Sequence, residues 1–410
     1  MKLLIISHSF PPKSGARALQ IGKVKAAIES LGFDVRVIAG LNTSNKAIIP
    51  KDQPQENVYF VPYSTINGGQ SFPARLCLRV YREIMTMNPK NKWVRYAFQK
   101  SLSIVNKFKP NLMLTSSTPF ESHMVGLKLK KHTALPWVAS FSDPWPSAIN
   151  PSPYNAYEMP IVKNFQIASL RSVLNSCDAV HMINKHALKL VERKTGVNLS
   201  QKGFAVTHVG SSSNINDAPA KIDDGWLIHL GFLSRERVSQ QLLEAVKISV
   251  ISNPNRFKGL FLVGKVCVEF RALVEKMGMQ NMVHYFGSVS QKDAMAIANR
   301  ASALIVLEAD MPESPFLPSK FADYALAGRP IIAVTPRRSP IREYLSQYGG
   351  GYAVSHDKKE ISDAIQLVLN KDSDYLAGRS TLSKQFTSES VGQKYANMFH
   401  EILAKQKQTS

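Results

Sequence analysis

The sequence predicts an α/β protein with two doubly wound parallel sheets, and three observations lead to this class. Short apolar runs, each about as long as a buried strand, alternate with segments whose apolar residues recur at helical spacing. A stretch rich in Ser, Asn, Asp and Gly at residues 210–225 interrupts this alternation, which then restarts. A chain of 410 residues with 44% hydrophobic content is also large enough for two domains that each bury a core.

The first forty residues contain the repeating unit. We expect a strand at residues 3–7, a helix at 19–31 that ends at Gly32, and a second strand at 35–39. A strand, a helix and a strand in this order make a parallel pair. Residues 1–210 are therefore predicted to form the first domain.

The same alternation predicts the remaining elements. The second domain is predicted at residues 222–385, and the last helix, within 386–410, is expected to pack back on the first domain. Two such domains would place a ligand cleft at the carboxyl ends of their strands. Further strands are expected at residues 112–115, 137–141, 179–183, 226–230, 260–263, 283–286, 303–307 and 331–334, and further helices at 240–249, 270–277, 292–301, 320–327, 340–348, 360–369 and 387–405.

The composition favours anionic partners and a reducing compartment. The net charge is +21, which suits phosphates, nucleic acid or an anionic membrane face. The cysteines Cys77, Cys177 and Cys267 are odd in number and lack metal-site spacing, so a disulfide scaffold is not expected. No apolar run approaches the roughly 20 residues of a membrane span, and the run near the start is too short for a secretory signal. We therefore expect a cytoplasmic protein.

One basic segment begins at Arg75 and ends at Lys109. It contains nine basic residues and one acidic residue, Glu83, interleaved with apolar and aromatic side chains. Such a pattern is typical of a helix that lies on an anionic membrane surface. The alternative is a solvated helix whose apolar face packs on its own domain. A nucleic-acid partner is not expected, because no nucleic-acid motif accompanies the segment.

The strongest local signal for chemistry is the loop and helix that begin at Pro318. Free backbone N–H groups at a helix start bind phosphate, and here Ser319 adds a hydroxyl and Lys320 a cation. Asp323, one turn further along, could accept hydrogen bonds from a ribose. The alternative is a capped surface helix, which ends at Gly328.

Two further segments follow predicted strands and carry glycine and arginine. Gly231 ends the strand at 226–230, and the next loop carries Arg235 and Arg237, of which one is expected to be only a surface charge. After the first strand, Gly15 allows close backbone approach to a ligand, and Arg17 lies just beyond it. The second segment is not a G-x-G-x-x-G motif, so a nicotinamide or flavin cofactor is not indicated.

Two polar side chains, His123 and Asp143, follow the strands predicted at 112–115 and 137–141. Both would face the cleft, where they could position a sugar hydroxyl. A single histidine is as often structural, and that alternative stays open.

These segments together resemble the family 4 retaining glycosyltransferases, which have the GT-B fold of two Rossmann-like domains facing a central cleft. The resemblance extends from the first strand to about residue 370. Residues 318–330 look like a "PSK…(E/D)Y…AAG(K/R)P" donor loop, 231–237 like "G-T-L-Y-x-x-R", 117–123 like "S-x-P-x-x-x-H" and 141–145 like "FRDPW". The chain departs from the pattern at Ser142, where the motif has arginine, and at Pro315, where many members have a glutamate. Glu313 is near that position but out of register.

The resemblance implies a role for each candidate residue. Arg237 and Lys320 would stabilise the leaving nucleoside diphosphate without a metal, while His123 and Asp143 would address the sugar or the acceptor. The remaining donor-binding residues would be Gly15, Arg17, Gly231, Arg235, Pro318, Ser319 and Asp323. No cofactor is implied beyond the nucleotide-sugar co-substrate; UDP-sugar is the default and GDP remains open. The first domain would bind the acceptor, a glycan or lipid-linked glycan of surface polysaccharide biosynthesis at the inner face of the membrane.

Two other functions remain open at this point. A nucleotide-sugar 2-epimerase shares the architecture but needs several catalytic carboxylates, which the basic donor loop does not favour. A non-catalytic GT-B scaffold subunit at the membrane would explain the loss of arginine at Ser142.

Overall fold

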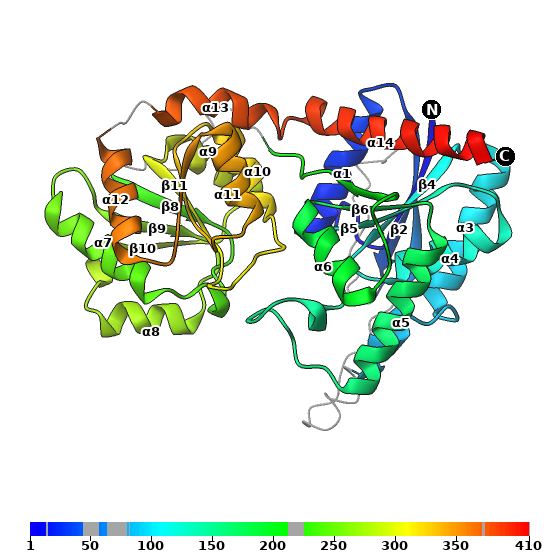
Figure 1. Cartoon of the computed structure of the whole chain (residues 1–410), viewed down its shortest axis with the longest axis horizontal. Helices are drawn as coiled ribbons and strands as arrows, with labels where there is room; N and C mark the ends of the chain where they lie inside the picture. Colours follow the sequence, from blue (N-terminus) through cyan, green and yellow to red (C-terminus); the bar gives the residue numbers. More distant parts are fainter. Residues whose placement is uncertain are drawn as a thin grey trace. The chain divides into compact units, whose positions relative to one another are not determined.

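A computed structural model describes residues 1–13, 15–43, 57–63, 80–81, 83–211, 225–370 and 374–409. These residues form two compact units. Unit 1 contains Met1–Asn150, Asn155–Thr207 and Val391–Ser410, and unit 2 contains Pro151–Tyr154 and His208–Ser390. Each unit is a parallel sheet with flanking helices (Figure 1).

Unit 1 has seven parallel strands in the order β3-β2-β1-β4-β5-β6-β7. The order reverses between β1 and β4, which makes this the switch point where open α/β sheets bind ligands. The strands are β1 Lys2–Ser7, β2 Asp34–Asn42, β3 Val58–Tyr63, β4 Leu112–Ser117, β5 Trp137–Phe141, β6 Ala179–Met182 and β7 Gly203–Ala205.

The helices of unit 1 include one from the far end of the chain. The C-terminal helix α14 packs on α1, since Gly392 lies against the backbone of Ala27 and Phe399 meets Phe33 at 6.1 Å between ring centroids (Figure 1). The helices are α1 Ala16–Glu29, α3 Lys92–Phe108, α4 Glu121–His132, α5 Pro160–Ser176, α6 Lys185–Thr195 and α14 Ser388–Thr409, with a short η1 at Ser147–Ile149.

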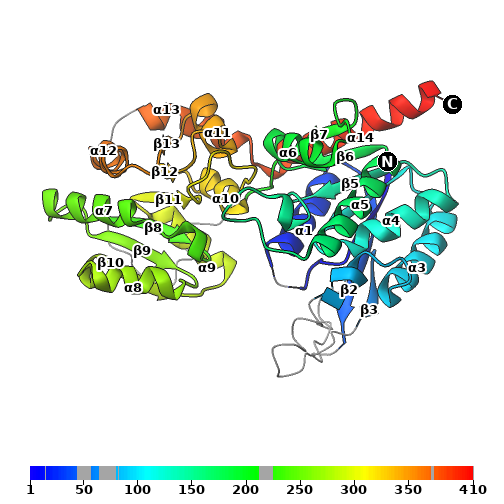
Figure 2. The ribbon, with the colours of Figure 1, turned by 60° about the horizontal axis from the view of Figure 1, so that its bottom comes forward.

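Unit 2 repeats the topology with six parallel strands in the order β10-β9-β8-β11-β12-β13 (Figure 2). Its switch point lies between β8 and β11. The strands are β8 Trp226–Leu230, β9 Gly259–Val263, β10 Val283–Gly287, β11 Ala303–Leu307, β12 Ile331–Val334 and β13 Gly351–Val354. The helical segments are η3 Arg235–Arg237, α7 Gln240–Ser252, α8 Val268–Lys276, η4 Gln280–Met282, α9 Gln291–Arg300, α10 Ser319–Ala327, α11 Pro340–Tyr348, α12 Lys358–Leu369 and α13 Asp374–Lys384.

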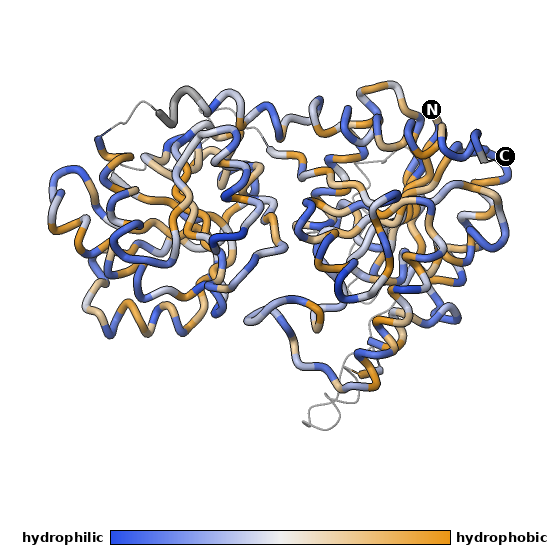
Figure 3. Tube along the Cα trace, in the orientation of Figure 1, coloured by the Kyte–Doolittle hydropathy of each residue, from blue (hydrophilic) through white to orange (hydrophobic). Residues whose placement is uncertain are grey.

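The apolar strands form the centre of each unit, as the hydropathy colouring in Figure 3 shows. In unit 1, Leu4 and Ile6 belong to one buried cluster with Val94 of α3 and Val125 of α4. Unit 2 builds its cluster in the same way from α7, α8 and α12 against the sheet. Parallel strands are covered on both faces, which explains why their sequences read as continuous apolar runs.

The two-sheet α/β fold predicted from the sequence is confirmed, and the central strands lie where they were expected. Three of the four edge strands, β3, β7 and β13, and helix α13 were not predicted, whereas the edge strand β10 was predicted. Edge strands are buried less completely, so their sequences lack the apolar run that marks a central strand. Unit 2 includes Pro151–Tyr154 and residues 208–210, which the sequence analysis placed in the first domain. Most of the expected linker lies outside the described residues.

The basic segment from Arg75 to Lys109 is described only in part, because residues 75–79 and 82 lie outside the described ranges. Its helix α3 buries Trp93 and Val94 in the core of unit 1 and exposes Tyr96 on the other side. Within the described part of the chain, no helix is both long and apolar enough to cross a membrane. The membrane contact stays a prediction.

Candidate active site

The candidate site in unit 2 lies at the switch point between β8 and β11. Strand β8 runs into Gly231 and the η3 turn, and the loop after β11 leads to the start of α10. Loops that follow neighbouring parallel strands meet at the carboxyl edge of the sheet. This topology brings together the two segments that the sequence marked separately.

Helix α10 begins without a side-chain cap. Its N-cap is Pro318, which makes no side-chain cap, and no acidic residue lies in the first turn. The N–H groups of Ser319 and Lys320 precede the first intrahelical hydrogen bonds, and they carry the positive end of the helix dipole. This helix start is therefore suited to an anion.

Lys320 is held in place by a buried histidine of β8. Its Nζ lies 3.1 Å from Nε2 of His229, and Nδ1 of His229 lies 3.2 Å from the carbonyl oxygen of Ile305. A carbonyl can only accept, so Nδ1 carries the ring proton and Nε2 accepts a hydrogen bond from Lys320. Burial lowers the pKa of His229 well below its usual value and keeps the ring neutral. The histidine thus fixes the ammonium without neutralising its charge.

The surroundings of Lys320 make its charge costly. Burial, with a further contribution from the charge of Arg237, lowers the pKa of Lys320 to about 7. Gly231 has φ +87, and a Cβ at that position would lie 3.5 Å from Lys320 Nζ. The glycine therefore leaves space beside the ammonium, and an anion placed there would stabilise its charged form.

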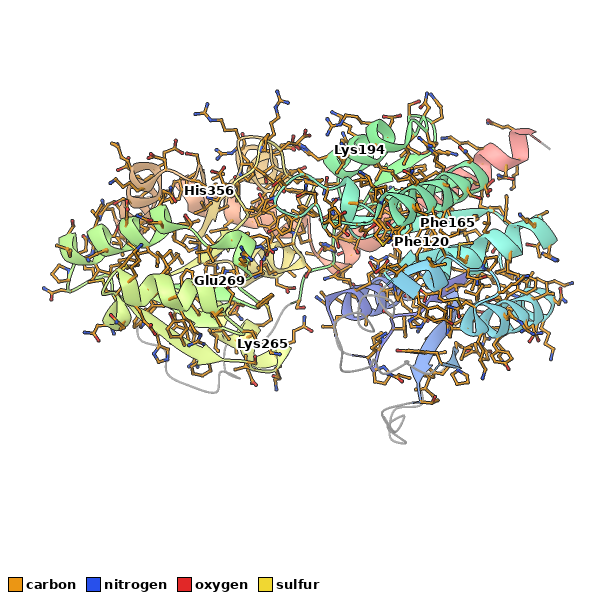
Figure 4. All side chains as sticks on the ribbon, turned by 90° about the horizontal axis from the view of Figure 1, so that it is seen from below. Phe120, Phe165, Lys194, Lys265, Glu269 and His356 are labelled. Atoms are coloured by element: carbon orange, nitrogen blue, oxygen red, sulfur yellow. The ribbon has the colours of Figure 1, made fainter. Side chains whose placement is uncertain are left out.

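The two arginines of η3 have different environments. Arg237 donates from Nε to the hydroxyl of Tyr154 at 3.1 Å, and the Tyr154 ring meets Phe316 edge-on at 4.9 Å. Arg235 has a side chain that is 78% exposed, with Nε 3.9 Å from a carboxylate oxygen of Glu269. Glu269 lies on α8 (Figure 4). Arg237 therefore belongs to the cationic cluster with Lys320, and Arg235 lies at the surface.

Two acidic side chains of unit 2 accept hydrogen bonds from the protein. One oxygen of Asp323 accepts from the backbone N–H of Ser211 at 2.7 Å. The buried carboxylate of Glu308, which follows β11, accepts from the hydroxyls of Ser314 and Ser339. Asp323, for which a ribose contact was expected, thus already accepts a hydrogen bond from the protein with one of its two carboxylate oxygens.

His123 is fully buried in unit 1. Its Nδ1 lies 2.7 Å from Oγ1 of Thr115, which also accepts a hydrogen bond from Nε1 of Trp137. If the Thr115 hydroxyl donates to Nδ1, the ring proton is on Nε2, and Nε2 has no hydrogen-bond partner within the described structure. Burial lowers the pKa of His123 to about 3, so the ring is neutral, and in this tautomer Nε2 is a hydrogen-bond donor.

Aromatic rings enclose His123 on two sides. The Phe141 ring lies 4.3 Å from the imidazole and the Phe120 ring 5.4 Å from it, and Phe120, labelled in Figure 4, stacks on Trp145. An unpaired buried N–H costs free energy, so its persistence here needs an explanation. A hydroxyl of a ligand would provide the missing acceptor.

The remaining candidates of unit 1 lie at the carboxyl ends of its strands. Asp143 is exposed and accepts a hydrogen bond from the Ser142 hydroxyl at 3.2 Å. Gly15, with φ +130, is the N-cap of α1, and Arg17 in the first turn of that helix contacts Ser116 of β4. The structure therefore places Gly15 and Arg17 in a different unit from the cationic cluster of Lys320 and Arg237.

Three residues of the unit 2 site were not among the sequence candidates. His229 is the polar residue in an otherwise apolar strand just before a glycine, which is a signal that could have marked it. Glu308 directly follows a predicted strand, as a site residue often does. Tyr154 comes from a segment between elements of unit 1, and nothing in the sequence pattern connects it to Arg237.

Metal coordination has no candidate in the part of the chain that the structure describes. No group of three or more His, Cys, Asp or Glu side chains there is arranged to hold a metal ion.

No protein-family model matches the chain, and no curated protein matches it in sequence. Solved structures do match in fold over nearly the whole length. HepE of Anabaena in complex with UDP has a TM-score of 0.65 at 14% identity, covering 98% of this chain and 100% of that one. Sucrose-phosphate synthase of Thermosynechococcus elongatus has a TM-score of 0.64 at 13% identity, with 98% and 99% covered. UDP-GlcNAc 2-epimerase of Methanocaldococcus jannaschii has a TM-score of 0.52 at 12% identity, with 98% and 100% covered. The chain thus has the two-unit α/β fold of the GT-B glycosyltransferases.

Proposed function

We propose that the protein is a glycosyltransferase that binds the diphosphate of a nucleotide sugar in unit 2 and transfers the sugar to an acceptor. The observation that carries this proposal is the pairing of Lys320 and Arg237 at the uncapped start of α10. The charge of Arg237 acts on Lys320, whose Nζ lies 3.5 Å from the position of a Cβ on Gly231, and α10 starts without a side-chain cap. The fold adds support, because HepE, with the same architecture, is solved with UDP and with UDP-glucose.

In this proposal the chemistry is stabilisation of a leaving group. Negative charge develops on the nucleoside diphosphate as the bond to the sugar breaks, and fixed cations stabilise it most where water is excluded. Lys320, oriented by His229, and Arg237, oriented by Tyr154, would supply this charge. The N–H groups of Ser319 and Lys320 would complete the diphosphate site, so that no metal ion is needed. Transfer with retention of configuration is the stereochemical outcome we propose.

The sugar would be addressed from unit 1. With the ring proton on Nε2, His123 presents a neutral N–H that has no acceptor among the described residues, which suits a sugar hydroxyl. Asp143 is exposed and able to accept a hydrogen bond from a sugar or an acceptor. In unit 2, Asp323 remains our proposal for the ribose contact, and one of its oxygens already accepts a hydrogen bond from the backbone N–H of Ser211.

We propose a UDP-sugar as the donor and a glycan or lipid-linked glycan as the acceptor. The choice of UDP rests on the UDP complexes of the structural neighbours, and GDP is the alternative base. The choice of acceptor rests on the net charge of +21 and on the basic segment that starts at Arg75, both of which suit an anionic membrane surface.

The test is a ligand screen with UDP, GDP, ADP, CMP and their sugar conjugates, with and without EDTA, by thermal shift and calorimetry. A ligand at about a hundred times its Kd stabilises a fold by roughly 2.7 kcal/mol, which is readily detected. We expect one nucleoside diphosphate to bind regardless of EDTA and to lose affinity in Lys320→Ala and Arg237→Ala. The absence of binding by any nucleotide would contradict the proposal.

A nucleotide-sugar 2-epimerase is the second candidate, because one structural neighbour carries that name. The two functions differ in product. Incubation of the donor alone yields an isomerised nucleotide sugar for an epimerase, whereas a transferase leaves the sugar unchanged until an acceptor is added.

A further inference from the structure

Unit 1 exposes large apolar side chains on two segments of its surface. One is a helical stretch at residues 80, 81 and 83–86, and the other extends from residue 157 into the start of α5. Six of the thirteen large hydrophobic side chains that are exposed in the described part of the chain belong to these segments. Single exposed apolar side chains are normal, whereas a concentration of them marks an interaction site. We call the six side chains the apolar patch: Tyr81, Ile84, Tyr157, Met159, Ile161 and Phe165.

A hydrogen bond joins the two segments. Nε2 of Gln166, a buried residue of α5, donates to Oε2 of Glu83 in the helical stretch at 3.2 Å. Each of these two residues has a member of the apolar patch beside it in the sequence. Ile84 follows Glu83, and Phe165, labelled in Figure 4, precedes Gln166. The two segments therefore lie side by side on unit 1.

The exposed side of α5 begins with apolar residues, where an amphipathic helix has polar ones. Val162 and Leu170 are buried in unit 1, as expected of its inner side. Ile161 and Phe165, one turn apart, are 79% and 45% exposed. Ile161 adds little to the core, so packing within unit 1 does not account for an apolar residue at this position.

The exposed charges in the same stretches of chain have one sign. The start of α3 is tied to the helical stretch by a hydrogen bond from Nδ2 of Asn91 to the carbonyl oxygen of Met85 at 3.0 Å. The two acidic residues, Glu83 and Glu158, are partly buried, and each accepts a hydrogen bond from the protein. Among the described residues of 80–96 and 155–176, the exposed charged side chains are all basic: Lys90, Lys92, Arg95 and Arg171.

We propose that the apolar patch inserts into the interface of an anionic lipid bilayer, with these basic side chains at the headgroups. Interfacial surfaces bind bilayers through buried apolar area together with attraction to anionic lipids. Tyrosine suits this position, because its ring is apolar and its hydroxyl is polar. Helix α3 then contributes charge and little apolar area, since its Trp93 and Val94 lie in the core of unit 1. The inference rests on the membrane location of the acceptor in the proposed function, and it assigns the contact surface.

Charge distinguishes the bilayer from other partners. A second copy of the chain, docked on the same patch about a two-fold axis, would bring the basic side chains of both copies together, and like charges oppose such a contact. A nucleic acid would use the basic side chains, but its affinity comes mainly from phosphate contacts, which leaves Ile161 and Met159 without a role. An anionic bilayer uses both the apolar and the basic side chains.

Flotation of the full chain with phosphatidylcholine vesicles, with and without phosphatidylglycerol, tests the proposal. We expect binding that is at least roughly tenfold tighter when phosphatidylglycerol is present. Replacing two patch residues, Ile161→Gln with Phe165→Gln, should weaken this binding roughly tenfold or more, because their apolar area no longer enters the bilayer. Ile248→Gln with Ile251→Gln is the matched control, on exposed positions of α7 in unit 2, and should change the binding less than about twofold.

Two further variants complete the test. Tyr157→Ser with Met159→Ser removes a second pair of patch residues, so the result does not depend on the folding of one variant. Lys90→Gln with Lys92→Gln should weaken binding to the anionic vesicles roughly fivefold or more and leave binding to phosphatidylcholine alone unchanged.

Four results would overturn the proposal. They are no vesicle binding by the unmodified chain, binding that does not depend on phosphatidylglycerol, equal binding by the patch and control variants, and a dimer in analytical ultracentrifugation that the patch variants dissociate.

The Kd for UDP, measured on the same proteins, separates this inference from the proposed function. Patch variants that lose vesicle binding and retain their affinity for UDP support the membrane surface. UDP binding without any vesicle binding contradicts the membrane surface alone. Vesicle binding through the patch without binding of any nucleotide contradicts the proposed donor site alone.

Discussion

UDP binding should be linked to the protonation of Lys320. The pKa of this residue is lowered to about 7 by burial and by the charge of Arg237, so much of its charge is lost above neutral pH in the free protein. A diphosphate beside Nζ would oppose both effects and raise the pKa toward the ordinary 10.5. Because the anion binds the charged form, affinity should be constant below pH 7 and fall as the pH rises above it.

The size of the effect follows from the two pKa values. Between pH 7 and the pKa of the complex, each pH unit lowers the affinity by up to about tenfold, or about 1.4 kcal/mol. From pH 6.5 to 8.5 the Kd for UDP should therefore rise about 25-fold. The terminal phosphate of UDP, with a second pKa near 6, contributes little to the change over this range.

Isothermal titration calorimetry in two buffers of different ionisation enthalpy measures the linked proton directly. At pH 8.5, binding to the unmodified protein should take up close to one proton for each UDP. Lys320→Met should bind UDP roughly tenfold to a hundredfold more weakly at pH 6.5, without proton uptake and with a flat pH profile. Arg235→Met, which removes an exposed arginine from the same turn, should retain the pH dependence.

Either of two results would refute this reasoning. A Kd that does not change between pH 6.5 and 8.5 would mean that Lys320 does not titrate there or does not contact the anion. A slope that persists in Lys320→Met would mean that another group carries the linked proton.

Four further outcomes are expected. In the free protein, the pKa of Lys320 is lowered, so the unfolded state binds more protons than the folded state between pH 7 and 10.5, and the free energy of unfolding rises with pH in that window. Lys320→Met should therefore have a higher Tm than the unmodified protein below pH 7, and the difference should shrink above pH 7. Differential scanning fluorimetry across this pH range measures both. His123→Gln should lower the transfer rate roughly tenfold and leave the Kd for UDP within about twofold, and an equal loss in both would argue against a sugar contact. Gly126→Ala should destabilise unit 1 by about 1–3 kcal/mol in urea unfolding, because its Cβ would lie 2.6 Å from the Trp137 ring. EDTA should leave the affinity for UDP unchanged, and any loss on adding it would point to a metal-dependent site.

The central strands could be predicted from the sequence because burial on both faces selects continuous apolar runs. Strand β5, Trp137–Phe141, and strand β8, Trp226–Leu230, have the predicted bounds for this reason. At the sheet edges that selection is weaker. Strand β7 has only three residues, Gly203–Ala205, and β13 begins with a glycine, so neither produces a pattern that stands out from a loop.

The candidate site also contains some residues that could be predicted from the sequence and others that could not. Residues that follow predicted strands or open a helix, such as Lys320 and Arg237, could be found because sequence order alone brings them to the same sheet edge. The residues that orient these two cations could not be found from the sequence. His229 acts through the tautomer fixed by Ile305, and that depends on the pairing of β8 with β11.

The path of the chain between the two units affects how the protein can be divided. Unit 1 is built from three separate pieces of the sequence and unit 2 from two, with boundaries after residues 150, 154, 207 and 390. A gene cut at the boundary after residue 207 would leave Tyr395 in the fragment that lacks His181, and would separate Tyr154 from Arg237. Expression of half the chain is therefore a poor route to either unit.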